Sequence, residues 1–180
     1  MNLVKPVSGV RVLVSSQRVS QVLAAALTIL SLQTAWAFSP TGKFPTGPNA
    51  QTTPGDLCTK PTAYRYPEKI KYCDRNVDSS FKNEIIQMYD RQFGYTIENM
   101  QRSQFKIDHY IPLCAGGSNE RENLWPQHIS VYTITDPLEP LICGKMAAGR
   151  LSQAKAVEFI KAAKNNLSMV PDIIKTVNRL

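Results

Sequence analysis

The sequence has no apolar run long enough to cross a membrane as a helix, which takes about 20 residues. Its apolar run at residues 22–32 is roughly half that length. Residues 1–37 contain no Asp or Glu, whereas they contain Lys5, Arg11 and Arg18 and end in Ala-Trp-Ala. A basic start, a short apolar segment and small residues before a cleavage point are typical of a secretion signal. We therefore predict a cleaved signal peptide at 1–37 and an exported protein, periplasmic or secreted; an uncleaved anchor is the alternative.

The sequence also lacks any Cys-x-x-Cys pair, a spacing common in structural zinc sites, so we expect no such site. All four cysteines follow the predicted signal peptide, and an even number in an exported protein favours disulfides. Four cysteines allow three pairings. We favour Cys58–Cys73, which closes a short loop, together with Cys114–Cys143, which would tie the strand region to a later helix.

An excess of charge is absent once the predicted signal peptide is set aside. The chain carries +7, of which residues 1–37 supply +3, so +4 remains on residues 38–180. This mildly basic balance is compatible with a polyanionic substrate but does not by itself indicate one.

Hydrophobic periodicity is missing from residues 38–56, which are rich in Pro, Gly and Thr, so we expect a flexible leader outside the core. Residues 57–180 are expected to form the folded domain. Within it, residues 57–77 predict irregular structure held by a disulfide. Helical spacing of apolar residues begins at Ser79, with Ser79 or Ser80 as the expected cap and Gly94 as the expected stop.

The rest of the domain predicts a mixture of strands and helices. Residues 105–113 alternate between apolar and polar side chains, which favours a strand, and a turn at 115–119 leads to a second extended piece at 123–126. Further helices are expected at 134–148, at 152–165 with Ser152 as cap, and at the C-terminus with Pro171 near the start. These elements predict an α+β fold.

The most informative segment is IDHYIPLCAGGSNERENLWPQH, residues 107–128. It resembles the HNH nucleases, also called the ββα-metal or His-Me finger family. Its Leu-Trp-Pro-Gln motif is similar to that of an exported bacterial branch of the family. In that family an Asp-His pair leaves the first strand, a Gly-Gly-Ser-Asn loop follows, and Asn-Leu begins the second strand. The resemblance implies a hairpin and a following helix around a metal ion, packed on additional helices.

The resemblance also implies a role for three of these residues. Phosphodiester hydrolysis needs an activated water, and a neutral imidazole can take its proton, so His109 is the expected general base. A divalent cation can stabilise the charge on the phosphate, and Asp108 is its expected ligand. Asn123 matches the middle Asn of the family, and its amide can hold the loop that positions His109.

The sequence departs from the family at the second protein ligand of the metal, because the stretch after the hairpin offers no His or Asn in the usual place. We nominate His128, the only other histidine, with Asp136 in reserve. Mg²⁺ is the metal that these ligands favour, while Mn²⁺, Zn²⁺ and Ni²⁺ stay open.

Together these features predict an endonuclease that cleaves DNA, with RNA as a further candidate, and with little sequence preference because no base-reading module is present. Arg121, near the loop, is the expected contact to phosphate. The alternatives are a catalytically inactive exported domain that binds nucleic acid, and an interaction protein whose target is not nucleic acid.

Overall fold

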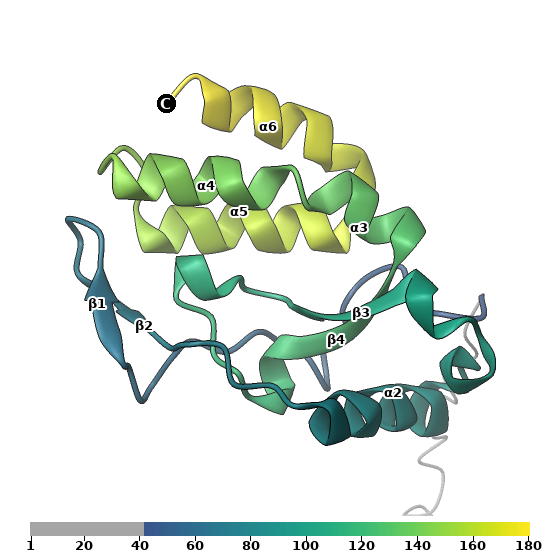
Figure 1. Ribbon diagram of the computed structural model, residues 1–180. Coiled ribbons are helices and arrows are strands. Elements are labelled where there is room, and N and C mark those ends of the chain that lie inside the picture. Colours follow the sequence, from purple (N-terminus) through teal and green to yellow (C-terminus); the bar gives the residue numbers. More distant parts are fainter. Residues whose placement is uncertain (1–41) are drawn as a thin grey trace, which may run out of the picture. The chain divides into compact units, whose positions relative to one another are not determined.

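The computed structural model describes residues 42–180, so the predicted signal peptide lies outside the described residues (Figure 1). Helices and two small antiparallel sheets alternate along this part of the chain, which confirms the α+β prediction. No helix within it is long and apolar enough to span a membrane.

The centre of the fold is an antiparallel hairpin of β3 (Phe105–His109) and β4 (Leu124–His128). Phe105 lies opposite His128, and His109 lies opposite Leu124. Strand β3 is shorter than predicted because the chain turns at Ile111 and Pro112 into a 3-10 turn, Leu113–Ala115. Helix α3 (Ile129–Thr135) begins directly after β4.

Helix α2 (Ser79–Phe93) follows the predicted bounds, but its cap differs from the prediction. The cap is Asp78, whose carboxylate accepts a hydrogen bond from the backbone N–H of Phe81 at 2.8 Å. Asp78 has an extended backbone immediately before the first turn, the geometry that capping requires, whereas Ser79 is already helical. The predicted stop at Gly94 is confirmed, because this glycine adopts a left-handed conformation with φ of 70°.

The expected single helix at 134–148 is instead two helices, α3 and α4 (Leu138–Ala147). Pro137 separates them, because its ring nitrogen has no hydrogen to donate to the preceding turn. The predictions for the last two helices are confirmed: Ser152 caps α5 (Gln153–Asn165), and Pro171 lies in the first turn of α6 (Val170–Asn178).

Two hydrophobic clusters lie on either side of this arrangement. One joins α2 to the hairpin through Tyr89, Leu124 and Trp125, all of which are fully buried. The other joins α4, α5 and α6 through residues such as Ile142 and Ile160, and the loop after β3 contributes to it. The hairpin is therefore supported by α2 on one side and by the C-terminal helices through its loop.

Residues 42–56 do not behave as the separate leader that we expected. Thr53 is fully buried, and its hydroxyl lies 2.8 Å from the Tyr89 hydroxyl and donates to the Leu124 carbonyl at 3.1 Å. Lys161 donates to the carbonyl of Pro54 at 2.7 Å. Hydrogen bonds and the packing of the single Phe44 hold this segment to the core, so no periodic hydrophobic pattern marks it in the sequence.

Residues 57–77 are also more regular than predicted, because they contain a second hairpin of β1 (Ala63–Arg65) and β2 (Ile70–Tyr72). Both expected disulfides are present, which confirms the favoured pairing. Cys58–Cys73 encloses the small hairpin, and Cys114–Cys143 joins the loop after β3 to α4. The two bonds therefore brace the segments that flank the central hairpin.

Candidate functional site

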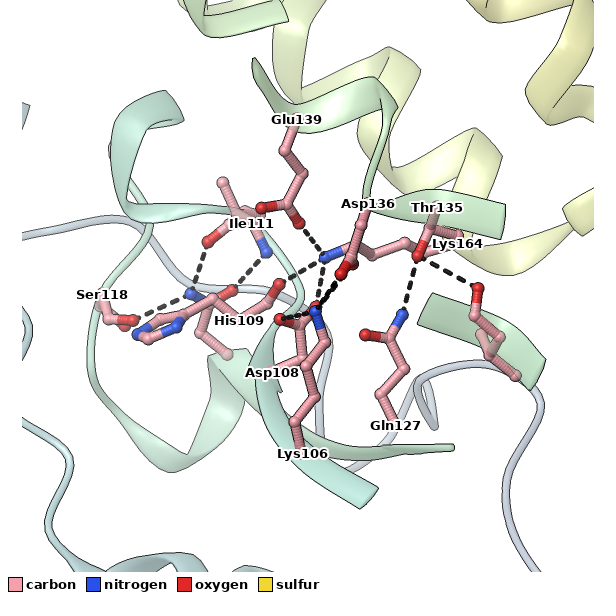
Figure 2. A network of polar contacts seen from close by, with 12 residues as sticks. Lys106, Asp108, His109, Ile111, Ser118, Gln127, Thr135, Asp136, Glu139 and Lys164 are labelled. Carbon is pink, nitrogen blue, oxygen red and sulfur yellow. Dashed lines mark hydrogen bonds and ion pairs between the residues drawn. The ribbon is translucent and has the colours of Figure 1, made fainter. Parts of the chain in front are cut away.

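A buried lysine from α5 lies beneath the end of β3. The Lys164 ammonium donates to Asp108 Oδ2 at 2.7 Å, to the His109 carbonyl at 2.7 Å and to Glu139 Oε1 at 2.8 Å (Figure 2). Its side chain is 2% exposed. All three N–H groups of the ammonium therefore have an oxygen partner, as a buried charge requires.

The second carboxylate oxygen of Asp108 faces another ammonium. Lys106 lies 3.3 Å from Asp108 Oδ1, and it donates to the two carboxylate oxygens of Asp136 at 2.7 and 2.9 Å. Burial acts to raise the pKa of Asp108, but Lys164 and Lys106 outweigh it, so the pKa lies below its usual value. Asp108 is therefore an ionised partner of two lysines.

The charge on Lys164 is stable for the same reason. Burial acts to lower its pKa, but the carboxylates of Asp108 and Glu139 outweigh this effect and the pKa is raised. Burial, opposed by Lys164, raises the pKa of Glu139. In the network Lys106–Asp108–Lys164–Glu139, the ammonium of Lys164 thus offsets the negative charge of both carboxylates.

This arrangement does not fit the metal site that the sequence led us to expect. Each carboxylate oxygen of Asp108 already contacts an ammonium group, Oδ1 that of Lys106 and Oδ2 that of Lys164. A divalent ion bound to either oxygen would therefore lie beside a positive charge. The electrostatic repulsion between like charges at such distances is large in a buried site. The reserve ligand, Asp136, is likewise engaged by Lys106.

His128 is not brought near Asp108. It lies opposite Phe105, at the other end of the hairpin from His109, a separation of roughly 13 Å along the strand. Its ring stacks on Phe44 with centroids 4.0 Å apart, and its Nδ1 accepts from the Ser130 backbone N–H at the start of α3. His128 therefore caps helix α3 and packs against Phe44. Among residues 42–180, no group of three His, Cys, Asp or Glu side chains is placed to hold a metal ion.

His109 lies on the other side of the strand from Asp108, because successive side chains of a strand alternate. Its ring is directed towards Ser118, away from the lysines (Figure 2). The residue is 3% exposed, and Nε2 lies 3.1 Å from Asn119 Oδ1. The side chains of Asp108 and His109 therefore point to opposite faces of the strand.

The hydrogen bonds of Asn119 determine which nitrogen of His109 carries the proton. Asn119 donates to the Asp74 carbonyl at 2.7 Å, and its Oδ1 accepts from the Asn76 backbone N–H at 3.2 Å. The amide thus presents an acceptor to the ring, so Nε2 is protonated and Nδ1 holds a free lone pair. Nδ1 is buried and has no hydrogen-bond partner among the described residues.

The ring of His109 is neutral at physiological pH. Burial lowers the pKa of His109 to about 4, opposed by the hydrogen bond that Nε2–H donates to Asn119 and assisted by the positive charge of Arg75. A neutral imidazole with one anchored nitrogen and one free nitrogen has the protonation state of a general base.

Asn123 holds the loop between the strands. It is fully buried; its Oδ1 accepts from the Ile111 backbone N–H at 2.8 Å, and its Nδ2 donates to the carbonyls of Ile111 and Ser118 at 2.9 Å each. Gly117 fits here only because it has no side chain, since a Cβ would lie 1.8 Å from the Ile111 carbonyl oxygen. Asn123 thereby positions the chain that follows His109.

Arg121 lies away from this network. It forms an ion pair with Glu84 of α2 at 3.3 Å, and its guanidinium lies over the Phe81 ring. Its charge is thus partly neutralised, and it does not line the cleft that borders Asp108.

Sequence analysis missed Lys164, Glu139 and Asn119 as members of the site. A signal for Lys164 was available, because it lies four residues after Ile160 on the buried stripe of a helix. A lysine at such a position needs a buried carboxylate partner. No family model, curated protein or solved structure matches this chain.

Proposed function

We propose that this domain hydrolyses phosphodiester bonds of nucleic acid as an exported endonuclease, with His109 as the general base. The observation that carries the proposal is the state of its ring: neutral, anchored at Nε2 by Asn119, and with a free lone pair on Nδ1. The hairpin with its Asn123-pinned loop supports the likeness to HNH nucleases. The two disulfides suit an oxidising compartment outside the cytoplasm.

In the proposed reaction, Nδ1 of His109 takes a proton from the water whose oxygen attacks the phosphorus. The P–O bond to one sugar oxygen breaks, and that oxygen leaves with the sugar and takes a proton from solvent water. Asn119 holds the ring in the required tautomer, and Asn123 holds the strand end that bears it. Because Nδ1 is covered in the structure, water reaches it only when a neighbouring segment moves. The exposed segment 74–76 is bonded to Asn119, so a movement of this segment would also loosen the anchor of Nε2.

The family resemblance includes a divalent metal ion, but the Asp108 network does not fit one, so no step of the proposed reaction uses an ion at that residue. Asp108 instead holds Lys164, and through it the carbonyl of His109. In this proposal Asp108 and Lys164 are positioning residues for the strand end that carries the base.

The test is cleavage of supercoiled plasmid by the purified, oxidised protein, with and without added Mg²⁺ or Mn²⁺. His109→Ala should lower the rate by about 10²–10⁴-fold, the usual contribution of a general base. His128→Ala is the matched control, because it removes the other histidine at the far end of the hairpin. Equal rates for wild type and His109→Ala would refute the proposal.

A catalytically inactive domain that binds nucleic acid is the second candidate. It is favoured by the saturation of Asp108 with two ammonium groups and by the covered Nδ1 of His109. This candidate predicts that wild type and His109→Ala bind DNA equally well and that neither cleaves it under any metal condition.

A further inference from the structure

The cleft that borders Asp108 has basic residues from four separate segments of the chain on its walls. It has a volume of ≈ 510 Å³, which is within the range of roughly 300–1,000 Å³ found for ligand sites. The basic residues are Arg75 before α2, Lys82 in α2, Arg102 before β3 and Lys106 in β3. Cations that converge from several elements on one cavity can contact neighbouring phosphates of one strand.

Each of the three carboxylates of the same cleft is already paired with at least one of two ammonium groups of the protein, which together leave one unit of negative charge. Lys106 contacts Asp108 and Asp136, and Lys164 contacts Asp108 and Glu139 from behind the wall. Arg75 and Lys82, by contrast, form no ion pair with a carboxylate of residues 42–180. Their charge is therefore available to an anion that enters the cleft.

Arg75 also connects this cleft to His109. Its positive charge contributes to the electrostatic environment of the imidazole, while its side chain is exposed and lines the cleft. Its neighbours, Asp74 and Asn76, bond to the Asn119 amide that anchors the ring. An anion bound by Arg75 would thus lie beside the segment that holds Asn119, the anchor of the ring.

We propose that this cleft binds the phosphate backbone of nucleic acid through Arg75 and Lys82, and that the protein's own ammonium groups, Lys106 and Lys164, stand where a metal-dependent nuclease would hold its ion. The connection between this cleft and the reaction at His109 rests on the proposed function. The binding itself does not, because it follows from the cleft and its charges. Asp108 then serves to hold the two ammonium groups instead of a divalent ion.

The experiment is fluorescence anisotropy with a short fluorescein-labelled DNA duplex, in EDTA and in Mg²⁺, over a series of salt concentrations. The variants are Arg75→Ala, Lys82→Ala and their combination; both side chains lie outside the ion-pair network, so their loss leaves it intact. Lys175→Ala in α6 combined with Arg179→Ala at its C-terminal cap is the matched control for the double variant, with the same change of charge at exposed positions. Circular dichroism checks that each variant is folded.

We expect the wild type to bind equally well in EDTA and in Mg²⁺. Each cleft substitution should weaken binding by about tenfold, the usual effect of losing one hydrogen bond to a charged group. The double cleft variant should also reduce the slope of log affinity against log salt by about 2, since each lost phosphate contact accounts for about 0.9. The α6 control should bind as wild type does.

Binding that requires Mg²⁺, no binding by the wild type, or equal losses in the cleft and α6 variants would each overturn the inference. Its failure is distinguishable from failure of the proposed function. Cleavage that depends on His109 but is insensitive to Arg75 and Lys82 would support the nuclease proposal and refute phosphate binding in the cleft. EDTA-resistant binding through the cleft without any cleavage would support phosphate binding in the cleft and refute the nuclease proposal.

Discussion

Replacing Lys164 with methionine should destabilise the domain more than any other single lysine change that the structure suggests. The substitution removes the ammonium but leaves Asp108 ionised, the His109 carbonyl without its donor, and Glu139 beside a carboxylate. Removing one partner of a buried ion pair costs about 3–5 kcal/mol, chiefly because the remaining charge is left uncompensated. Lys106 still contacts Asp108 at 3.3 Å, so we expect a value near the lower end of that range.

The free energy of unfolding can be measured by urea denaturation, followed by tryptophan fluorescence. Trp125 is fully buried and is the only tryptophan outside residues 1–37, so it reports directly on the hairpin. A loss of about 3 kcal/mol corresponds to a fall in melting temperature of roughly 10 °C for a domain of this size. The control is Lys155→Met, which breaks an exposed pair with Glu158 and should cost no more than about 1 kcal/mol.

A double variant, Asp108→Asn with Lys164→Met, separates the lost pair from lost packing. Because both charges are then removed, it should be more stable than Lys164→Met alone by about 2 kcal/mol. A cost below about 1 kcal/mol for Lys164→Met would refute this account of the network. So would a double variant no more stable than the single one, because the penalty would then come from packing and not from charge.

Three further predictions concern the hairpin, the imidazole and the first disulfide. Asn123→Ala leaves the backbone groups of Ile111 without their partners, so unfolding free energy in urea should fall by about 2–3 kcal/mol, whereas an unchanged midpoint would contradict the pinning role. His109 has a pKa lowered from 6.5 to about 4, so the unfolded chain binds more protons between these pH values. The contribution of the neutral His109 to the free energy of unfolding is therefore complete above pH 6.5. It is lost as the pH falls towards 4, by up to about 3 kcal/mol. In His109→Asn this slope should be shallower than in wild type, and parallel slopes would contradict the lowered pKa. Replacing Cys58 and Cys73 by serine should lower the melting temperature and the unfolding free energy, the latter by about 3 kcal/mol, since the bond closes a loop of 15 residues.

The hairpin and much of its loop could be predicted because their signals are local. Alternation in β3, the turn residues at Gly116 and Gly117, and an amide at Asn123 all lie within one short segment, and each constrains its neighbours. The caps at Ser152 and Gly94 are local for the same reason. Such features depend on the backbone of a few residues, which a single sequence specifies well.

The partners of Asp108 could not be predicted in the same way. Lys164 and Glu139 lie 56 and 31 residues further along the chain, and only the packing of α4 and α5 brings them to β3. A resemblance in the motif assigns Asp108 to a metal, whereas the electrostatics of its neighbours assign it to lysines. The motif describes the strand; the opposite wall of the site comes from elsewhere in the sequence.

The segment at residues 42–56 has a consequence for the order in which the molecule assembles. The hydroxyl of Thr53 pairs with Tyr89 and with the carbonyl of Leu124, which lie 36 and 71 residues later in the chain. The carbonyl of Pro54 accepts from Lys161, which lies 107 residues later. Residues 42–56 therefore cannot make all of these contacts until helix α5 has been synthesised. Pairings between segments this far apart in the sequence slow folding.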